Sequence, residues 1–278
     1  MSFDAFNSNA YLHHIAFYST RPLQLAKFYE NTLSIKKKRI PGGWLLSGSR
    51  RRVLIFSDKK NSLAFAGFAC QDSNSFKTLK RNFMKKGVET AQDNNSLFGN
   101  NNFFILDCDG NKIYFGLNKN RKDQSSNLYA PIQHITFTSK NLDNFIEFYV
   151  NKLGFRMSDK VVNNEGKVTT CFMRSNQEHH TVACFLSNKS GLDHYSFEAG
   201  TWEWIKNWCD HFSKQNIPLI WGPGRHGPGN NLFAFIEDPD GNKIEISAEL
   251  ELVHDRQVKK WPHEPKTLNL WGSAIMRS

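Results

Sequence analysis

The sequence has few cysteines, and they do not form the spacings that build a disulfide framework. Their number is odd, and no two of them form a Cys-x-x-Cys pair. We therefore expect reduced thiols in a cytoplasmic protein, most of them acting as small core residues. The five are Cys70, Cys108, Cys171, Cys184 and Cys209.

Long hydrophobic runs are also missing. No stretch approaches the roughly 18 consecutive apolar residues of a membrane-spanning helix. Residues 1–10 are polar and lack the apolar core of a signal peptide. These absences predict a cytoplasmic protein with no membrane partner.

Acidic residues are fewer than basic ones, which leaves a formal net charge of +10. The basic residues form short runs at 36–38 and 50–52. No nucleic-acid-binding motif accompanies them, so we interpret both runs as solvated surface and expect no nucleic-acid partner.

The sequence does contain material for a substantial core. Of its 278 residues, 39% are hydrophobic and 23 are phenylalanine. This length fits one or two domains. So many phenylalanines favour packed β-rich layers or an apolar pocket.

One unit recurs along the chain. A strand at 11–17 precedes a helix that opens at Arg21-Pro22, and the same order returns at 131–137 with a helix that stops at Gly154. Strands at 63–68 and 192–197 also precede helices, and each of these units ends in an Asp-Gly hairpin, at 107–114 and 238–245. We expect an α+β fold of four βαβββ modules, arranged in two tandem domains of curved, partly closed mixed sheet with outer helices. The expected boundaries are 1–118, a linker at 119–129, 130–252, and a tail at 253–278 that packs on the surface.

The segment 221–248 carries the most chemistry. A Gly/Pro-rich loop contains His226, an apolar strand follows at 232–236, and a tight turn then leads to Glu245 between Ile244 and Ile246. A carboxylate within an apolar strand is costly to bury unless it is paired or bound to a metal. This cost directs attention to histidines elsewhere in the chain.

Comparing the two halves position by position isolates a set of candidate ligands. The second half has His134, His194 and Glu245, where the first half has His14, Phe65 and Tyr114. Two histidines and one carboxylate suit a non-haem Fe(II) ion with open coordination positions. A single histidine on a strand is more often a core residue, and we interpret His14 in that way.

With these residues in place, the chain resembles the vicinal oxygen chelate superfamily, and within it the two-domain type I extradiol ring-cleavage dioxygenases. The resemblance spans nearly all of residues 8–275 and is most specific at 133–135, 178–183, 193–197 and 225–245. The ligand spacings, 60 (194 − 134) and 51 (245 − 194), are similar to those of that family. The resemblance implies that His134, His194 and Glu245 bind Fe(II), with Mn(II) as an alternative. It also implies that the protein is a homo-oligomeric enzyme that cleaves a catechol with O2.

The resemblance also implies roles for other residues. His180 stands at the position of an acid/base that exchanges a proton with the catechol, although the adjacent His179 competes for this role. His226 stands where a histidine hydrogen-bonds the substrate oxygen, with a loop-stabilising role as the alternative. Phe172 is expected in the pocket wall. Phe235 replaces a tyrosine whose hydroxyl usually contacts the bound catechol, and a phenyl ring cannot form that bond.

Two other functions fit the same fold. One is a metal-dependent isomerase or thiol transferase of the glyoxalase or fosfomycin-resistance type. The other is a non-enzymatic binder of the bleomycin-resistance type, which does not need a metal. Kinship of fold alone does not decide among them.

Overall fold

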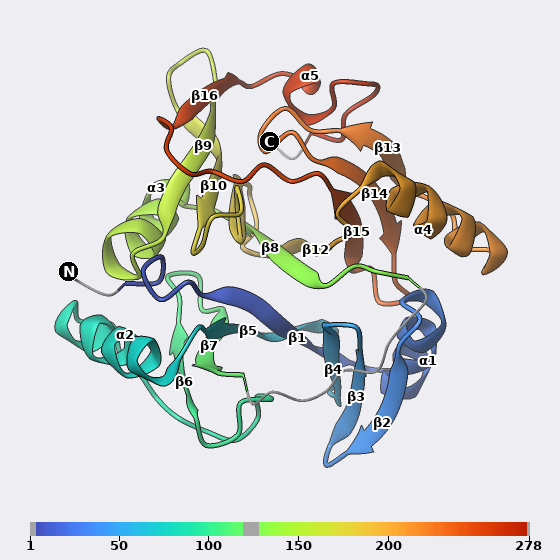
Figure 1. The fold of residues 1–278 in the computed structure, drawn as a ribbon, viewed down its shortest axis with the longest axis horizontal. Coiled ribbons are helices and arrows are strands. Elements are labelled where there is room, and N and C mark those ends of the chain that lie inside the picture. Colours follow the sequence, from blue (N-terminus) through green and yellow to red (C-terminus); the bar gives the residue numbers. More distant parts are fainter. Residues whose placement is uncertain (1–3, 119–127, 277–278) are drawn as a thin grey trace.

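The computed structural model describes residues 4–118 and 128–276. Figure 1 shows two mixed sheets, one from each half of the chain, that approach each other where β1 and β8 run through the middle of the molecule. Helices lie outside the sheets. The α+β fold of two tandem halves is therefore confirmed.

The first half forms a seven-stranded sheet in the order β2-β3-β4-β1-β5-β7-β6. Antiparallel pairing of β1 with β5 joins its two modules, and within each module the first strand pairs in parallel with the last, β1 with β4 and β5 with β7. Its elements are β1 (Tyr11–Ser19), α1 (Pro22–Thr32), β2 (Lys36–Ile40), β3 (Gly43–Gly48), β4 (Arg51–Ser57), β5 (Ser62–Cys70), α2 (Ser73–Lys85), β6 (Asn102–Leu106) and β7 (Lys112–Leu117).

The second half repeats this plan in a nine-stranded sheet, in the order β13-β14-β15-β12-β8-β11-β10-β9-β16. Its first helix begins as α3 and continues as a wider π-helical segment, η1, which ends just before Gly154. The elements are β8 (Ile132–Ser139), α3 (Leu142–Ile146), η1 (Glu147–Lys152), β9 (Arg156–Val162), β10 (Val168–Arg174), β11 (Val182–Leu186), β12 (Gly191–Glu198), α4 (Trp202–Lys214), β13 (Trp221–Arg225), β14 (Leu232–Glu237), β15 (Lys243–Ala248), β16 (Lys259–Pro262) and α5 (Pro265–Leu268).

One module is less regular than the repeat suggests. After α2, the expected second strand of the module is reduced to a single bridge between Ala91 and Phe104. The segment that follows is rich in Asn and Asp, and Asp93 binds the side chains of Lys112 and Tyr114. These side-chain bonds replace a regular ladder because Asn and Asp readily bond to local groups in irregular backbone.

The C-terminal tail does more than cover the surface. Its strand β16 pairs in parallel with β9 and extends the second sheet. The following helix α5 carries Leu268 to the wall of the pocket described below. The linker expected at 119–129 falls mostly outside the described residues.

Reciprocal hydrogen bonds join the two halves. The hydroxyl of Tyr29 in the first half donates to Asp238 at 2.8 Å, and the hydroxyl of Tyr149 in the second half donates to Asp107 at 3.0 Å. The two carboxylates lie in the equivalent Asp-Gly turns of the two halves, so the contact follows the internal repeat. A continuous hydrophobic core crosses the same boundary.

The prediction of a solvated surface is wrong for the basic run at 50–52. Arg51 and Arg52 are both buried. The guanidinium of Arg51 donates to the carbonyls of Leu128 and Ala130 and lies over the ring of Trp208. A buried arginine is tolerated here because carbonyls at the junction of the halves and an aromatic face replace its water.

None of the helices formed by residues 4–118 and 128–276 has the length and apolar character needed to cross a membrane.

Candidate metal centre

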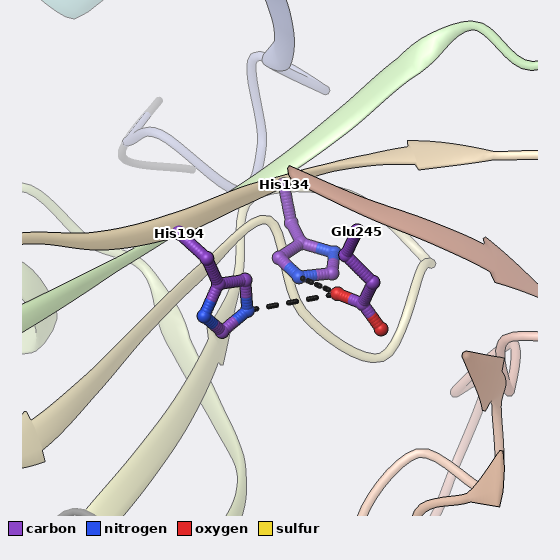
Figure 2. A group of neighbouring side chains, drawn as sticks. All are labelled: His134, His194 and Glu245. Atoms are coloured by element: carbon purple, nitrogen blue, oxygen red, sulfur yellow. Dashed lines mark ion pairs between the residues drawn. The ribbon is translucent and has the colours of Figure 1, made fainter. Parts of the chain in front are cut away.

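Three neighbouring strands bring the predicted ligands together. His134 lies on β8, His194 on β12 and Glu245 on β15, and these strands are adjacent in the sheet. Figure 2 shows both imidazoles directed at the carboxylate. Oε2 of Glu245 lies 3.0 Å from Nε2 of His134 and 3.6 Å from Nε2 of His194. One potential ligand atom from each residue lies within 4.8 Å of the other two.

Each side chain of this group is oriented by a polar neighbour. Nδ1–H of His134 donates to Oε1 of Gln133 at 2.6 Å, and Nδ1–H of His194 donates to Oδ1 of Asp193 at 2.6 Å. The amide of Asn231 donates to Oε1 of Glu245 at 3.3 Å. Such partners fix the tautomer of a histidine so that Nε2 is free to bind a metal.

The electrostatics of the group suit a cation. Burial lowers the pKa of His134, which favours its neutral form. Burial alone would raise the pKa of Glu245, but the imidazoles of His134, His226 and His194 hold it well below its ordinary value. With Nδ1 of both candidate histidines occupied, two nitrogen lone pairs and a carboxylate converge in a buried space. A metal ion would relieve their mutual repulsion, and the donor set fits Fe(II) or a similar divalent metal.

Two further histidines reach the same cavity. The ring of His180 lies 4.3 Å from that of His134, between centroids. Nε2 of His226 lies 3.6 Å from Oε1 of Glu245, while its Nδ1–H donates to the carbonyl of Leu268 at 2.5 Å. His179 does not line the cavity. His180 therefore lies beside the candidate ligands, whereas Nε2 of His179 lies 3.1 Å from Asp159, outside the cavity.

The walls of the cavity are largely apolar. The cavity has an empty volume of about 460 Å³. Phe172 contacts His180 on one side, with ring centroids 5.2 Å apart, and Phe235 contacts His194 on another, at 5.1 Å. Both phenylalanines line the cavity. The complete lining is His134, Thr136, Phe172, His180, Phe185, His194, Trp221, His226, Pro228, Asn231, Phe235, Glu245 and Leu268.

Several of these residues were not identified from the sequence. Trp221 stacks on Phe235, with centroids 5.2 Å apart and ring planes inclined by 27°. Its position at the start of the loop that carries His226 was a usable signal. Leu268 gave no signal, because only the folded tail brings it to the cavity.

The equivalent place in the first half is filled by side chains. Strand pairing puts Phe65 and Tyr114 at the register positions of His194 and Glu245. Their ring centroids are 4.8 Å apart, and the ring of His14 lies over Gly67, where an added Cβ would come within 2.2 Å of it. His14 is fully buried, as expected of a core residue.

Comparison with known proteins agrees with this architecture. Residues 131–246 match the model of the Glyoxalase/Bleomycin resistance protein/Dioxygenase superfamily. Metapyrocatechase 2 of Cupriavidus necator is 20% identical over 249 residues, which cover 80% of this chain and 75% of that protein. Lactoylglutathione lyase of Haemophilus influenzae is 31% identical over 125 residues, which cover 41% of this chain and 90% of that protein.

Solved structures share the fold across both halves. The Mn(II)-bound glyoxalase from Novosphingobium aromaticivorans has a TM-score of 0.84 at 20% identity, covering 96% of this chain and 92% of its own. A variant of homoprotocatechuate 2,3-dioxygenase from B. fuscum has a TM-score of 0.82 at 18% identity, covering 94% of this chain and 78% of its own.

Proposed function

Since this chain belongs to the glyoxalase/bleomycin resistance protein/dioxygenase superfamily, we propose that it is an Fe(II)-dependent extradiol dioxygenase. It would cleave the ring of a catechol next to the vicinal hydroxyls, with O2 as the second substrate. The observation that carries the proposal is a buried group of two histidines and one carboxylate at the base of a cavity that also contains two histidines outside that group.

His134, His194 and Glu245 would hold the ion, with Mn(II) as an alternative to Fe(II). When bound, the metal supplies a common template for the catechol oxygens and O2 and a route for electrons between them. Three protein ligands leave positions open for both substrates.

His180 would exchange a proton with the catechol. Burial, together with His134 and His179, keeps the pKa of His180 well below its ordinary value, so the ring is neutral near pH 7 and can accept a proton. It lines the cavity beside His134, within reach of a ring bound at the ion. A histidine placed in this way is suited to accept a hydroxyl proton and return it later.

His226 and the aromatic walls would position the ring. The bond from His226 Nδ1–H to the carbonyl of Leu268 leaves Nε2 for a substrate oxygen. Phe172, Trp221 and Phe235 would contact the faces and edges of the catechol and keep water out.

A metal-dependent isomerase of the glyoxalase type is the second candidate. The 31% identity to a lactoylglutathione lyase favours it. That match covers only 41% of this chain, whereas the match to metapyrocatechase 2 covers 80%. His180 and His226 in the cavity favour the dioxygenase, because they offer the proton transfer and oxygen contact that the ring cleavage needs.

The test is metal analysis combined with an oxygen electrode. Protein purified without oxygen and loaded with Fe(II) or Mn(II) is mixed with a panel of catechols, and O2 uptake is recorded with the absorbance of yellow ring-opened product. We expect stoichiometric uptake and product formation. An iron-loaded protein that consumes no O2 with any catechol, but converts a glutathione hemithioacetal, would establish the isomerase instead.

A further inference from the structure

Behind His180, away from the cavity, lies a row of buried polar side chains. Nδ1 of His180 is 2.9 Å from Nδ1 of His179, and Nε2 of His179 is 3.1 Å from Oδ2 of Asp159. His179 and Asp159 are completely buried. The row therefore connects the proposed acid/base to a carboxylate that has no place among the candidate metal ligands.

The C-terminal tail holds this carboxylate. Nη1 of Arg256 donates to Oδ1 of Asp159 at 2.8 Å, and Nε1 of Trp261 donates to Oδ2 at 2.7 Å. Burial alone would raise the pKa of Asp159, but the contacts with His179, Trp261 and Arg256 hold it below its ordinary value. Asp159 is therefore ionised, and an ionised carboxylate only accepts hydrogen bonds.

The charge on Asp159 determines where the hydrogens of the two rings lie. Nε2 of His179 is not well aligned for a hydrogen bond with Oδ2, so their contact is mainly electrostatic. A lone pair on that nitrogen would face the anion at 3.1 Å and be repelled, so Nε2 carries the hydrogen. With that hydrogen on Nε2, the uncharged form of His179 has a lone pair on Nδ1. The bond between the two rings consequently requires His180 to donate from its own Nδ1.

We propose that His179 and Asp159 are positioning residues for His180. They hold His180 in the tautomer with hydrogen on Nδ1, so that the lone pair of Nε2 is left for the cavity. The same logic places an aspartate behind the histidine of a serine hydrolase. The tail, through Arg256 and Trp261, thereby supports the site from outside the repeated modules. The expected effect on catalysis rests on the proposed function, whereas the assignment of the His180 tautomer does not.

The direct test is the nitrogen NMR spectrum of the full chain labelled with ¹⁵N-histidine and loaded with diamagnetic Zn²⁺. The ¹⁵N shifts of a neutral ring identify which nitrogen carries the hydrogen. We expect hydrogen on Nδ1 of His180 in the wild type. In Asp159→Asn and in His179→Phe we expect a shift toward hydrogen on Nε2.

A wild-type spectrum with the hydrogen on Nε2 of His180 overturns the proposal, whether or not the variants fold. So does a folded Asp159→Asn protein with an unchanged His180 tautomer. Trp261→Phe removes only one bond to Asp159 and should give a smaller shift of the tautomer. The exposed Trp202→Phe is its matched control and should give none.

Kinetics separate this inference from the proposed function. In Asp159→Asn we expect kcat for the catechol to fall about 10-fold to 100-fold, the usual loss when a partner that orients a functional imidazole is removed. KM and metal content should not change. If no catechol is turned over, the proposed function fails while the NMR result still decides the tautomer. Normal kcat in Asp159→Asn would overturn the positioning role even if ring cleavage is established.

Discussion

Removal of the Asp193 carboxylate gives the sharpest test of the metal centre, because this side chain touches a candidate ligand without being one. Oδ1 of Asp193 accepts the Nδ1–H of His194 at 2.6 Å, a short bond to a charged acceptor. In Asp193→Ala the ring of His194 loses the partner that fixes its tautomer and orientation. We expect metal affinity to fall about 10-fold to 100-fold, equivalent to roughly 1.4–2.7 kcal/mol.

The assay is an anaerobic titration of metal-free protein with Fe(II) or Mn(II) in competition with a chromogenic chelator. Asp193→Asn keeps a neutral acceptor and should lie between the wild type and the alanine variant. Asp210→Ala removes an exposed aspartate of α4 and serves as the matched control. If Asp193→Ala folds normally and binds the metal within twofold of the wild type, His194 does not ligate the ion in the way the geometry implies.

Four further predictions test other parts of the site. Glu245→Ala removes the carboxylate on which both imidazoles converge, so the purified variant should retain less than about a tenth of the wild-type metal; unchanged content by elemental analysis would contradict the site. His180→Ala should keep its metal but lose about 100-fold or more in kcat, and undiminished turnover would remove its acid/base role. Phe235→Tyr places a hydroxyl in the cavity beside His194 and should retain or raise activity on simple catechols; complete loss would mean that the position has another role. Burial raises the pKa of Glu198 to about 7 from 4.5, so the folded state binds the extra proton between these values and stability falls as pH rises through them. For that shift of 2.5 (7 − 4.5) the effect is about 3 kcal/mol, and urea unfolding of the metal-free protein at pH 5 and pH 8 should show a smaller pH dependence in Glu198→Gln than in the wild type.

Local patterns were sufficient for much of the fold. The strands predicted at 11–17 and 131–137 correspond to β1 and β8, because alternating or continuous apolar residues leave few other solutions. The helix predicted to stop at Gly154 does so, since glycine adopts the positive φ of +78° found there. The second strand of the second module was not predictable in its reduced form, because the bonds of Asp93 form only after Lys112 and Tyr114 have folded beside it.

The role of charged side chains was harder to predict. The run at 50–52 resembles any solvated basic segment, and only the junction of the halves provides the carbonyls and the tryptophan that bury Arg51. His179 and His180 are also alike in sequence. Only the folded chain separates them, placing one against Asp159 and the other in the cavity.

The sequence alone determined the duplication and the chemical identity of the candidate ligands, because a repeat and a residue type are properties of the chain itself. The sequence also predicted that His134, His194 and Glu245 lie on three strands, because side chains that alternate with a period of two are typical of a strand. Only the tertiary structure decided the distant neighbours of the site: Trp221 and Leu268 in the wall, and the tail that holds Asp159. Those contacts join segments up to about a hundred residues apart, and no local pattern encodes which of them meet.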